Sequence, residues 1–292
     1  MKKYKKLDFN TDDLENLSNS DLKKVANELR KNIITATFNA KSGHPGGSLS
    51  AADILSYLYF EEMNVDSKAP HDENRDRFVL SKGHAAPALY SVLALKGYIP
   101  AKDLKTLRHI DSYLQGHPDM KHTPGVDMST GSLGQGISAA VGMALSAKVQ
   151  NKSFRVYAML GDGELQEGQV WEASMFAGSH GLDNLTVVVD NNNLQIDGTV
   201  REICSPYPIG EKFRAFNFHV INIDAHDFDQ IRAAFKEAKS SKGKPTAIIA
   251  KSIKGKGVSF MENAVGWHGK APNEEQYKQA MQELEKNGEV SA

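Results

Sequence analysis

Cysteine is almost absent from this chain, which has Cys204 alone among 292 residues. A single cysteine excludes an internal disulfide and fits a reducing compartment. We expect Cys204 to be a small packed thiol, because no histidine motif accompanies it that would make it catalytic.

The chain also lacks an excess of either charge and any long apolar run. Lys and Arg number 35 against 36 Asp and Glu, so no field attracts nucleic acid or an anionic membrane. Hydrophobic residues make up 40% of the chain, yet no apolar stretch approaches the length of a membrane span. The first eight residues are basic but lack the apolar core of a signal peptide. We therefore expect a cytoplasmic protein that binds neither nucleic acid nor membrane.

Short apolar runs alternate with amphipathic segments along the chain. This alternation is typical of an α/β fold, a mostly parallel sheet with helices on both faces. No repeat, low-complexity tract or long linker divides the chain, so we predict one domain over residues 1–292, with peripheral ends at 1–20 and 272–292. Buried strands are predicted at 77–80, 154–160, 185–189, 219–223 and 246–250, and helices at 21–40, 50–59 with Ser50 as N-cap, 131–148, 231–238 and 276–285.

Two polar loops follow neighbouring predicted strands. Asp162 comes directly after the strand at 154–160, and Asn192 follows the strand at 185–189, with a helical segment between them. Such a βαβ unit brings both loops to the carboxyl edge of a parallel sheet, where ligands bind. Carboxylate and amide oxygens suit Mg²⁺, which fills its other positions with water and phosphate. The two loops therefore predict a metal that grips a diphosphate.

Other readings of these loops explain less. Each loop could be a plain turn, because Asp-Gly and Asn-rich segments favour turns. A dinucleotide fingerprint requires glycine where Gln166 stands. An EF-hand beginning at Asp190 requires a ligand at Leu194, glycine at Gln195 and glutamate at Arg201. No Gly-x-x-x-x-Gly-Lys-Ser/Thr segment occurs.

The Gly-Asp-Gly loop and the Asn-rich loop, taken with several other blocks, resemble the thiamine diphosphate fingerprint of transketolases. The blocks follow the family's order from about the first predicted helix to His268. They lie at 41–47, 80–85, 116–118, 129–136, 161–168, 190–198, 254–258 and 267–269. The enzyme 1-deoxy-xylulose-5-phosphate synthase shares the metal loops, but residues 165–168 look like transketolase.

This resemblance implies thiamine diphosphate and Mg²⁺ as cofactors, with Ca²⁺ or Mn²⁺ as substitutes for the metal. The metal ligands would be Asp162, Asn192 and the carbonyl of Leu194. Proline commonly precedes the matching leucine in the family, so Ser132 before Leu133 is a mild departure. The implied cofactor-binding residues are His84, Gly131, Leu133, Gly163, Glu164, Asn192, Ile196 and His268.

Four of the ten histidines lie in the matching blocks. An imidazole can donate to a sugar hydroxyl or phosphate and exchange protons near pH 7. The resemblance implies that His84 and His268 contact the diphosphate, that His44 and His268 flank the bond being broken, and that His117 holds the first hydroxyl of the donor ketose. His44, His117 and His268 are thus the predicted catalytic residues. The others stay unassigned: His71, His109, His122, His180, His219 and His226.

Two glutamates follow the Gly-Asp-Gly loop, Glu167 and Glu172. Similarity to the family implies a proton-relaying acidic cluster near the interface between active sites. Acidic residues early in a helix also complement its dipole, which is the plainer explanation.

The resemblance covers only the first domain of a transketolase. In that family a second domain holds the aminopyrimidine ring and a third follows it, whereas this chain ends about where the second would begin. We predict the N-terminal subunit of a split transketolase, completed by a C-terminal subunit in an α₂β₂ assembly. A truncated piece of a longer chain is the alternative, and the polar tail at 287–292 favours a subunit.

The predicted activity is transfer of a two-carbon ketol unit from a ketose phosphate to an aldose phosphate, as in the pentose phosphate pathway. One alternative is a related split enzyme that acts on a sulfo-sugar or another ketose. A second is an enzyme like 1-deoxy-xylulose-5-phosphate synthase. A third is a non-catalytic cofactor-binding subunit, which the intact histidine set argues against. The sequence does not name the sugar.

Overall fold

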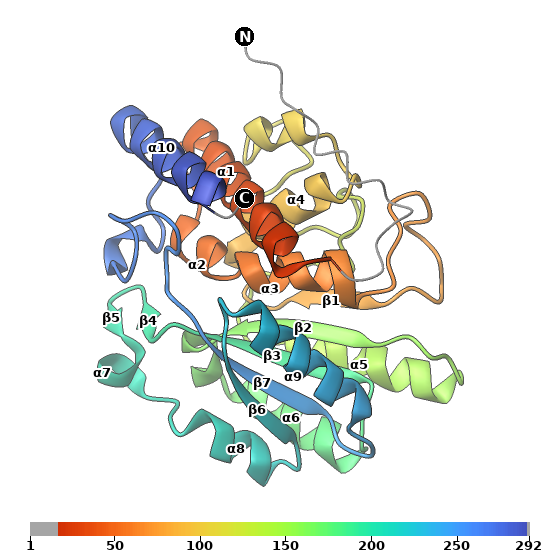
Figure 1. Cartoon of the computed structure of the whole chain (residues 1–292). Helices are drawn as coiled ribbons and strands as arrows, with labels where there is room; N and C mark the ends of the chain where they lie inside the picture. Colours follow the sequence, from red (N-terminus) through yellow and green to blue (C-terminus); the bar gives the residue numbers. More distant parts are fainter. Residues whose placement is uncertain (1–16, 291–292) are drawn as a thin grey trace.

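Five parallel strands form the central sheet, and helices cover both of its faces (Figure 1). The predicted α/β fold is therefore confirmed. The strands lie in the order β1 (Arg77–Leu80), β2 (Val156–Gly161), β3 (Leu185–Asn191), β7 (Thr246–Lys251) and β6 (His219–Asp224).

This computed structural model describes residues 17–290. Residues 1–16 and 291–292 of the predicted domain, with most of its N-terminal peripheral end, lie outside the described residues. No helix between residues 17 and 290 combines the length and apolar character needed to cross a bilayer.

The alternation of side chains along β2 explains why the sheet has two covered faces. Tyr157 and Met159 point into one core, which contains residues of α1 (Asn19–Ala40), α4 (Ala86–Leu95) and α9 (Phe228–Ser240). Val156, Ala158 and Leu160 point into a second core on the opposite face. That core is completed by α5 (Gln135–Val149), α6 (Gly168–Ser179) and α8 (Ile209–Ala215). A central parallel strand buried on both faces reads as a nearly continuous apolar run, as β2 does.

Helix α10 (Glu274–Val290) packs against α1, although the two lie at opposite ends of the described chain (Figure 1). The ring of Tyr277 stacks on Phe38 with centroids 4.3 Å apart, and Asn27 Nδ2 donates to the carbonyl of Leu284 at 2.7 Å. The helix predicted at 276–285 is confirmed and extends beyond both predicted ends. The remaining short elements are α2 (Pro45–Ser50), α3 (Ala52–Tyr57), η1 (Leu58–Glu62), η2 (Gly83–Ala85), η3 (Ala101–Thr106), η4 (Gly163–Gln166), β4 (Leu194–Gln195), β5 (Gly198–Thr199), α7 (Val200–Cys204) and η5 (Val265–Trp267).

The prediction of Ser50 as an N-cap is wrong. Ser50 is the last residue of α2, and the predicted helix at 50–59 is divided among α2, α3 and a π-helical turn, η1. The hydroxyl of Ser50 donates to the carboxylate of Asp190 at 2.7 Å, a contact between residues 140 positions apart. A partner so distant in sequence leaves no local signal.

Two predictions of burial are also wrong. Strand β6 lies at the edge of the sheet, and Ile223 is its one fully buried side chain, because an edge strand has a neighbour on one side only. Cys204 is exposed at the end of α7 rather than packed, because that short helix lies on the surface.

The predicted helix at 131–148 begins four residues later, at Gln135. Gly134 has a φ of 82°, a left-handed conformation that precedes the helix and suits glycine. Within α5, Gly136 allows the helix to lie close to the backbone of Ser81, since a Cβ at Gly136 would lie 2.6 Å from Ser81 Cα.

We expect Gly136→Ala to lower the free energy of unfolding by about 1–3 kcal/mol, because the added methyl group meets backbone rather than a movable side chain. The matched control is Gly142→Ala in the same helix, where an added Cβ meets nothing within 4 Å. That change should raise stability by about 0.5–1 kcal/mol through helix propensity. Urea unfolding measures both, and equal effects of the two substitutions would contradict close packing at Gly136.

Candidate active site

The two polar loops predicted to meet do meet at the carboxyl edge of the sheet. Strands β2 and β3 are in register with Gly161 opposite Asp190, so Asp162 and Asn192 follow adjacent strand ends. The carboxylate of Asp162 accepts the backbone N–H of Asn193 from the other loop, and that of Gly163 at 2.9 Å.

A pocket of about 330 Å³ opens beside these loops. All predicted site residues except His117 and Glu172 line it. The predicted residues in its wall are His44, His84, Gly131, Leu133, Asp162, Gly163, Glu164, Glu167, Asn192, Leu194, Ile196 and His268.

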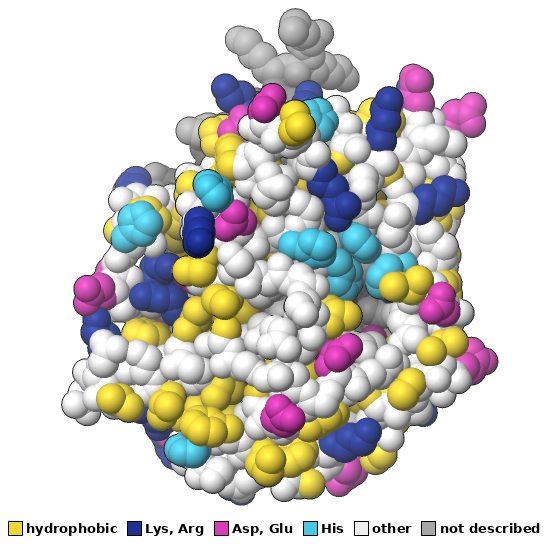
Figure 2. Space-filling model, turned by 180° about the vertical axis from the view of Figure 1, so that it is seen from behind, with side chains coloured by type: hydrophobic (Ala, Val, Ile, Leu, Met, Phe, Trp, Pro, Cys, Tyr) yellow, Lys and Arg dark blue, Asp and Glu magenta, His cyan; other side chains and the backbone are white. Residues whose placement is uncertain are grey.

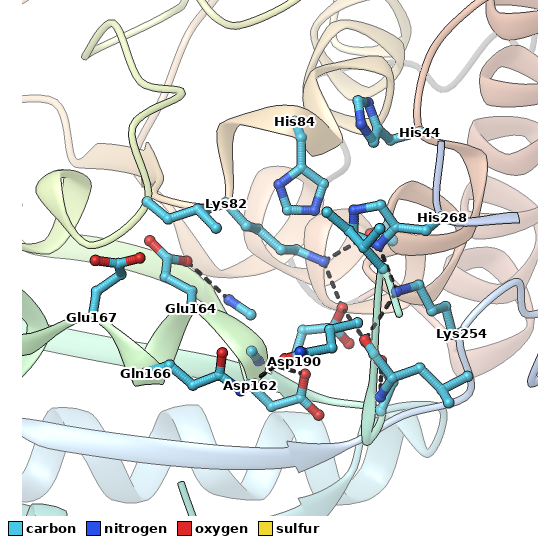
Figure 3. A pocket seen from close by; sticks show the side chains of 18 of the residues that line it. His44, Lys82, His84, Asp162, Glu164, Gln166, Glu167, Asp190, Lys254 and His268 are labelled. Atoms are coloured by element: carbon cyan, nitrogen blue, oxygen red, sulfur yellow. Dashed lines mark hydrogen bonds and ion pairs between the residues drawn. The ribbon is translucent and has the colours of Figure 1, made fainter. Parts of the chain in front are cut away.

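Three of the predicted histidines form a triangle in this pocket. His44 precedes α2, His84 lies in η2 and His268 follows η5, yet their ring centroids are 5.2 to 5.4 Å apart. Figure 2 shows histidine side chains gathered on this face of the molecule. In Figure 3 the three rings lie on one side of the pocket, opposite Asp162 and Asp190.

His117 lies beside this pocket, against Gly131. A Cβ at Gly131 would lie 2.9 Å from His117 Cγ, so glycine permits the contact. Arg108, which sequence reasoning did not single out, supports the same region from behind. Its guanidinium donates to Ser42 Oγ at 3.0 Å and lies 3.5 Å from Nδ1 of His44.

All four of these imidazoles are held in the neutral form near pH 7. Burial, followed by the charge of Arg108, lowers the pKa of His44 to about 4. Burial and then Lys254 lower the pKa of His268 to about 3. The pKa values of His84 and His117 are also lowered, first by burial and then by Lys82 and Arg108 respectively. Neutral imidazoles can each donate one hydrogen bond and accept one proton, as acid–base chemistry requires.

A buried ion pair between Lys82 and Asp190 lies beneath the histidines, and sequence reasoning missed it. The two side chains are 2% and 3% exposed, and Lys82 Nζ also donates to the carbonyl of Gly47 at 2.7 Å. Burial alone would raise the pKa of Asp190, but Lys82 and hydrogen bonds from Ser252 and Ser50 outweigh it, so that the pKa is lowered. Charged residues at the ends of two otherwise apolar strands were the available signal.

Lys254 is a second buried lysine that sequence reasoning left without a role, although it lies in a matching block. Its Nζ donates to the carbonyl of Leu194 at 2.9 Å and lies 2.8 Å from Nδ1 of His268. Burial lowers the pKa of Lys254 to about 8, so the ammonium form still predominates at pH 7. Two lysines in one small pocket fit an anionic ligand.

The predicted metal ligands fit a hard divalent cation in chemistry and placement. The carboxylate of Asp162, the amide oxygen of Asn192 and the carbonyl of Leu194 belong to residues that line the same pocket. Burial and then the charge of Asp190 raise the pKa of Asp162 to about 6, and a cation would relieve both effects. Within residues 17–290, no three His, Cys, Asp or Glu side chains gather to hold a metal. The predicted set does not depend on such a cluster, because it has one carboxylate.

The three glutamates have different surroundings. Glu164 is buried, and its carboxylate accepts hydrogen bonds from Ser81 Oγ and from the backbone N–H groups of Gly134 and Gly161. It therefore fixes the loops of the pocket wall. Glu167 precedes α6 in that wall and Glu172 lies one turn further along, and both are exposed. Their proton-relay role stays a prediction.

Gly163 begins η4, a 3₁₀ turn rather than an α-helix. Its backbone N–H donates to Asp162 Oδ1. The expectation that Gly163 binds the cofactor therefore also stays a prediction.

Comparison with known protein families accounts for this arrangement. Residues 22–290 match the model of the transketolase thiamine diphosphate binding domain. The chain belongs to this family. The transketolase resemblance seen in the sequence blocks is therefore confirmed, and the pocket at the carboxyl edge is that of a thiamine diphosphate-binding domain.

Two relatives within the transketolase family have nearly the same extent as this chain. It is 48% identical over 268 residues to the 6-deoxy-6-sulfo-D-fructose transketolase subunit of a Clostridium strain, covering 92% of this chain and 98% of the relative. It is 40% identical over 255 residues to one subunit of the apulose-4-phosphate transketolase of Phocaeicola vulgatus, covering 87% of this chain and 90% of that relative.

The transketolase of Campylobacter jejuni has the same fold in a crystal structure. The two superpose with a TM-score of 0.88 at 40% identity over 92% of this chain. The match covers 43% of the Campylobacter chain, so this chain spans less than half of that transketolase.

We expect Lys82→Met to lower the free energy of unfolding by about 3–5 kcal/mol at pH 7.5, because it leaves the carboxylate of Asp190 buried without its cation. In the wild type, the lowered pKa of Asp190 contributes stability that is present at neutral pH and is lost only in acid. In the variant, the effect of burial on Asp190 is less opposed, so the pKa of Asp190 rises. The loss of stability relative to the wild type should therefore shrink as the pH falls toward 4.5. Urea unfolding at both pH values measures this.

Lys148→Met is the matched control, because Lys148 pairs with Asp183 at 2.6 Å on the surface. Loss of this surface pair should lower the free energy of unfolding by less than about 1 kcal/mol. Similar losses for the two variants would contradict a structural role for the buried pair.

Proposed function

We propose that this chain is the thiamine diphosphate-binding subunit of a transketolase, active with Mg²⁺ and a second, C-terminal subunit. The observation that carries the proposal is the pocket, where three neutral imidazoles, two buried lysines and three oxygen donors face one another. Family membership and the two subunit-sized relatives support it.

The residues present fit the cofactor and the metal. Asp162, Asn192 and the carbonyl of Leu194 would hold Mg²⁺, with Ca²⁺ or Mn²⁺ as substitutes, and Lys254 and Lys82 would balance the charge of the diphosphate. Thiamine diphosphate, when bound, supplies the electron sink for cleaving the carbon–carbon bond beside a ketose carbonyl.

This chain's own side chains would position the sugar and move its protons. His44 and His268 lie with ring centroids 5.4 Å apart, so that both can reach one hydroxyl between them. Each is neutral near pH 7, and Nδ1 of each lies against a donor, Arg108 or Lys254. The ring proton is therefore on Nε2 and can be donated to the sugar. His117 would hold the first hydroxyl of the donor from its place beside Gly131. Glu167 and Glu172 would relay protons toward a neighbouring site.

Exposed hydrophobic side chains in the pocket wall and on α6 support the need for a partner. Met175 and Phe176 on α6 are 56% and 41% exposed, and Ile196 in the pocket wall is 66% exposed. Figure 2 shows hydrophobic side chains on the same face as the histidines. A C-terminal subunit that covers them would complete the site, in an α₂β₂ assembly located in the cytoplasm.

Two donor sugars are candidates. Xylulose 5-phosphate with ribose 5-phosphate as acceptor would place the protein in the pentose phosphate pathway. The relative at 48% identity is named for 6-deoxy-6-sulfo-D-fructose, which makes this sulfo-sugar the second candidate donor. Ketol transfer from each donor, measured with this chain alone and with a candidate C-terminal subunit, distinguishes them. Turnover by this chain alone would contradict the proposal that a second subunit completes the active site.

We expect Asp162→Ala to weaken binding of thiamine diphosphate in the presence of Mg²⁺ by 100-fold or more, on the order of 3 kcal/mol, because it removes the only carboxylate of the predicted metal set. Titration calorimetry at pH 7.5 measures this. Binding by the wild type should weaken below pH 6, because Asp162, with a pKa of about 6, must lose its proton to bind the metal. Asp111→Ala, at an exposed carboxylate, is the control. Unchanged affinity in Asp162→Ala would rule out this metal site.

We expect Met175→Asp to weaken association with the C-terminal subunit by tenfold or more, about 1.4 kcal/mol, because it introduces a charge into a surface that the partner would cover. Ile110→Asp is the control, since Ile110 is 96% exposed and does not line the pocket. Analytical ultracentrifugation measures association of each variant. If both variants assemble like the wild type, α6 does not contact the partner.

A further inference from the structure

A chain of hydrogen bonds behind the pocket leads to the backbone beside Lys254. His226, in the loop after β6, lies with Nδ1 2.6 Å from Asp53 Oδ2 of α3. On its other side, His226 Nε2 accepts the backbone N–H of Ile253 at 3.0 Å. Ile253 directly precedes Lys254, whose Nζ reaches into the pocket.

These contacts define the tautomer of His226. Because Nε2 accepts from Ile253, the ring proton is on Nδ1 and is donated to Asp53. Asp53 is buried and also accepts from Arg30 Nη1 at 3.2 Å. Burial would raise the pKa of Asp53, but Arg30 and His226 outweigh it and hold the pKa well below its usual range. A charged carboxylate therefore fixes the ring, as such partners do behind metal-binding histidines.

The backbone around Lys254 is held on both sides as well. The N–H of Gly255 donates to the carbonyl of Gly46 at 3.0 Å, and the carbonyl of Lys254 accepts from the N–H of Asn263 at 2.9 Å. Gly255 has a φ of 80°, and a Cβ there would lie 2.2 Å from the carbonyl oxygen of Met261. Among the described residues, His226 supplies the one side-chain hydrogen bond to the backbone of this turn at residues 253–255.

We propose that His226, held by Asp53, is a positioning residue that holds Lys254 where its ammonium group can contact the diphosphate of the cofactor. This inference rests on the proposed function, because it assumes that Lys254 meets that diphosphate. His226 itself does not line the pocket and acts through the backbone of Ile253. Lys82, by contrast, is held by Asp190 and Gly47, so the side chains that hold the two lysines differ.

Two substitutions of His226 separate its two hydrogen bonds. His226→Asn retains a donor near Asp53 but is too short to accept from Ile253, whereas His226→Gln retains an acceptor at that end. We expect the asparagine variant to bind thiamine diphosphate with Mg²⁺ roughly fivefold more weakly, the effect of about one hydrogen bond, and the glutamine variant to recover most of the loss. Titration calorimetry on the full 292-residue chain measures both.

His219→Gln is the matched control. His219 lies on the neighbouring strand β6 and pairs with Glu237 at the same 2.6 Å, but this pair is largely exposed and lies outside the pocket. Its substitution should leave the affinity unchanged.

A double-mutant cycle tests whether His226 acts through Lys254. In a Lys254→Ala background, His226→Asn should cause no further loss of affinity, because the group that it positions is gone. An equal fivefold loss in both backgrounds would overturn the proposal. If wild-type protein fails to bind thiamine diphosphate, the proposed function fails instead.

Hydrogen exchange gives a readout that needs no cofactor. The amides of residues 252–258 should exchange faster in His226→Asn than in the wild type, and those of β3 should not. Unchanged exchange at 252–258 would overturn the proposal even if affinity falls. Faster exchange throughout the chain would point to general destabilisation and would equally overturn it.

Discussion

The carboxylate of Asp190 is the interaction on which the rest of this site depends. It lies at the end of the central strand β3 and forms an ion pair with Lys82. It also accepts hydrogen bonds from Ser50, Ser252 and Asn192. Those partners come from α2, the segment after β1 and the segments after β3 and β7. A carboxylate buried without them would be too costly to keep ionised, so the loops of the pocket must be in place together.

The same burial sets the chemistry of the pocket. It keeps the imidazoles neutral, brings the pKa of Lys254 to about 8 and raises that of Asp162 to about 6. These are the directions expected when charged groups lose water without full compensation. A diphosphate with a divalent cation would supply the missing charges, because Lys254 needs an anion and Asp162 needs a cation. The free energy stored in these unfavourable states is therefore available for binding the cofactor.

Much of this could be predicted from the sequence. The loops bearing Asp162 and Asn192 follow apolar runs, and parallel strands bring such loops to one edge. The pairs that cross the fold could not be predicted, because Ser50 and Asp190 or His226 and Asp53 share no local pattern. Cys204 and β6 were misjudged because apolar composition does not tell a central position from an edge or a surface. Gly134 and Gly136 can be read from the sequence, but the groups that they pack against depend on the fold.

The sequence by itself determined the α/β class, the family and the residues of the two polar loops, because these follow from local apolar runs and from blocks of fixed spacing. Tertiary structure decided which groups share the pocket and in what protonation state. Lys82 and Lys254 are ordinary lysines in the sequence, and they face the histidines only because the strand ends converge. Burial and neighbouring charge are properties of the assembled fold, and they are what turn these side chains into a site.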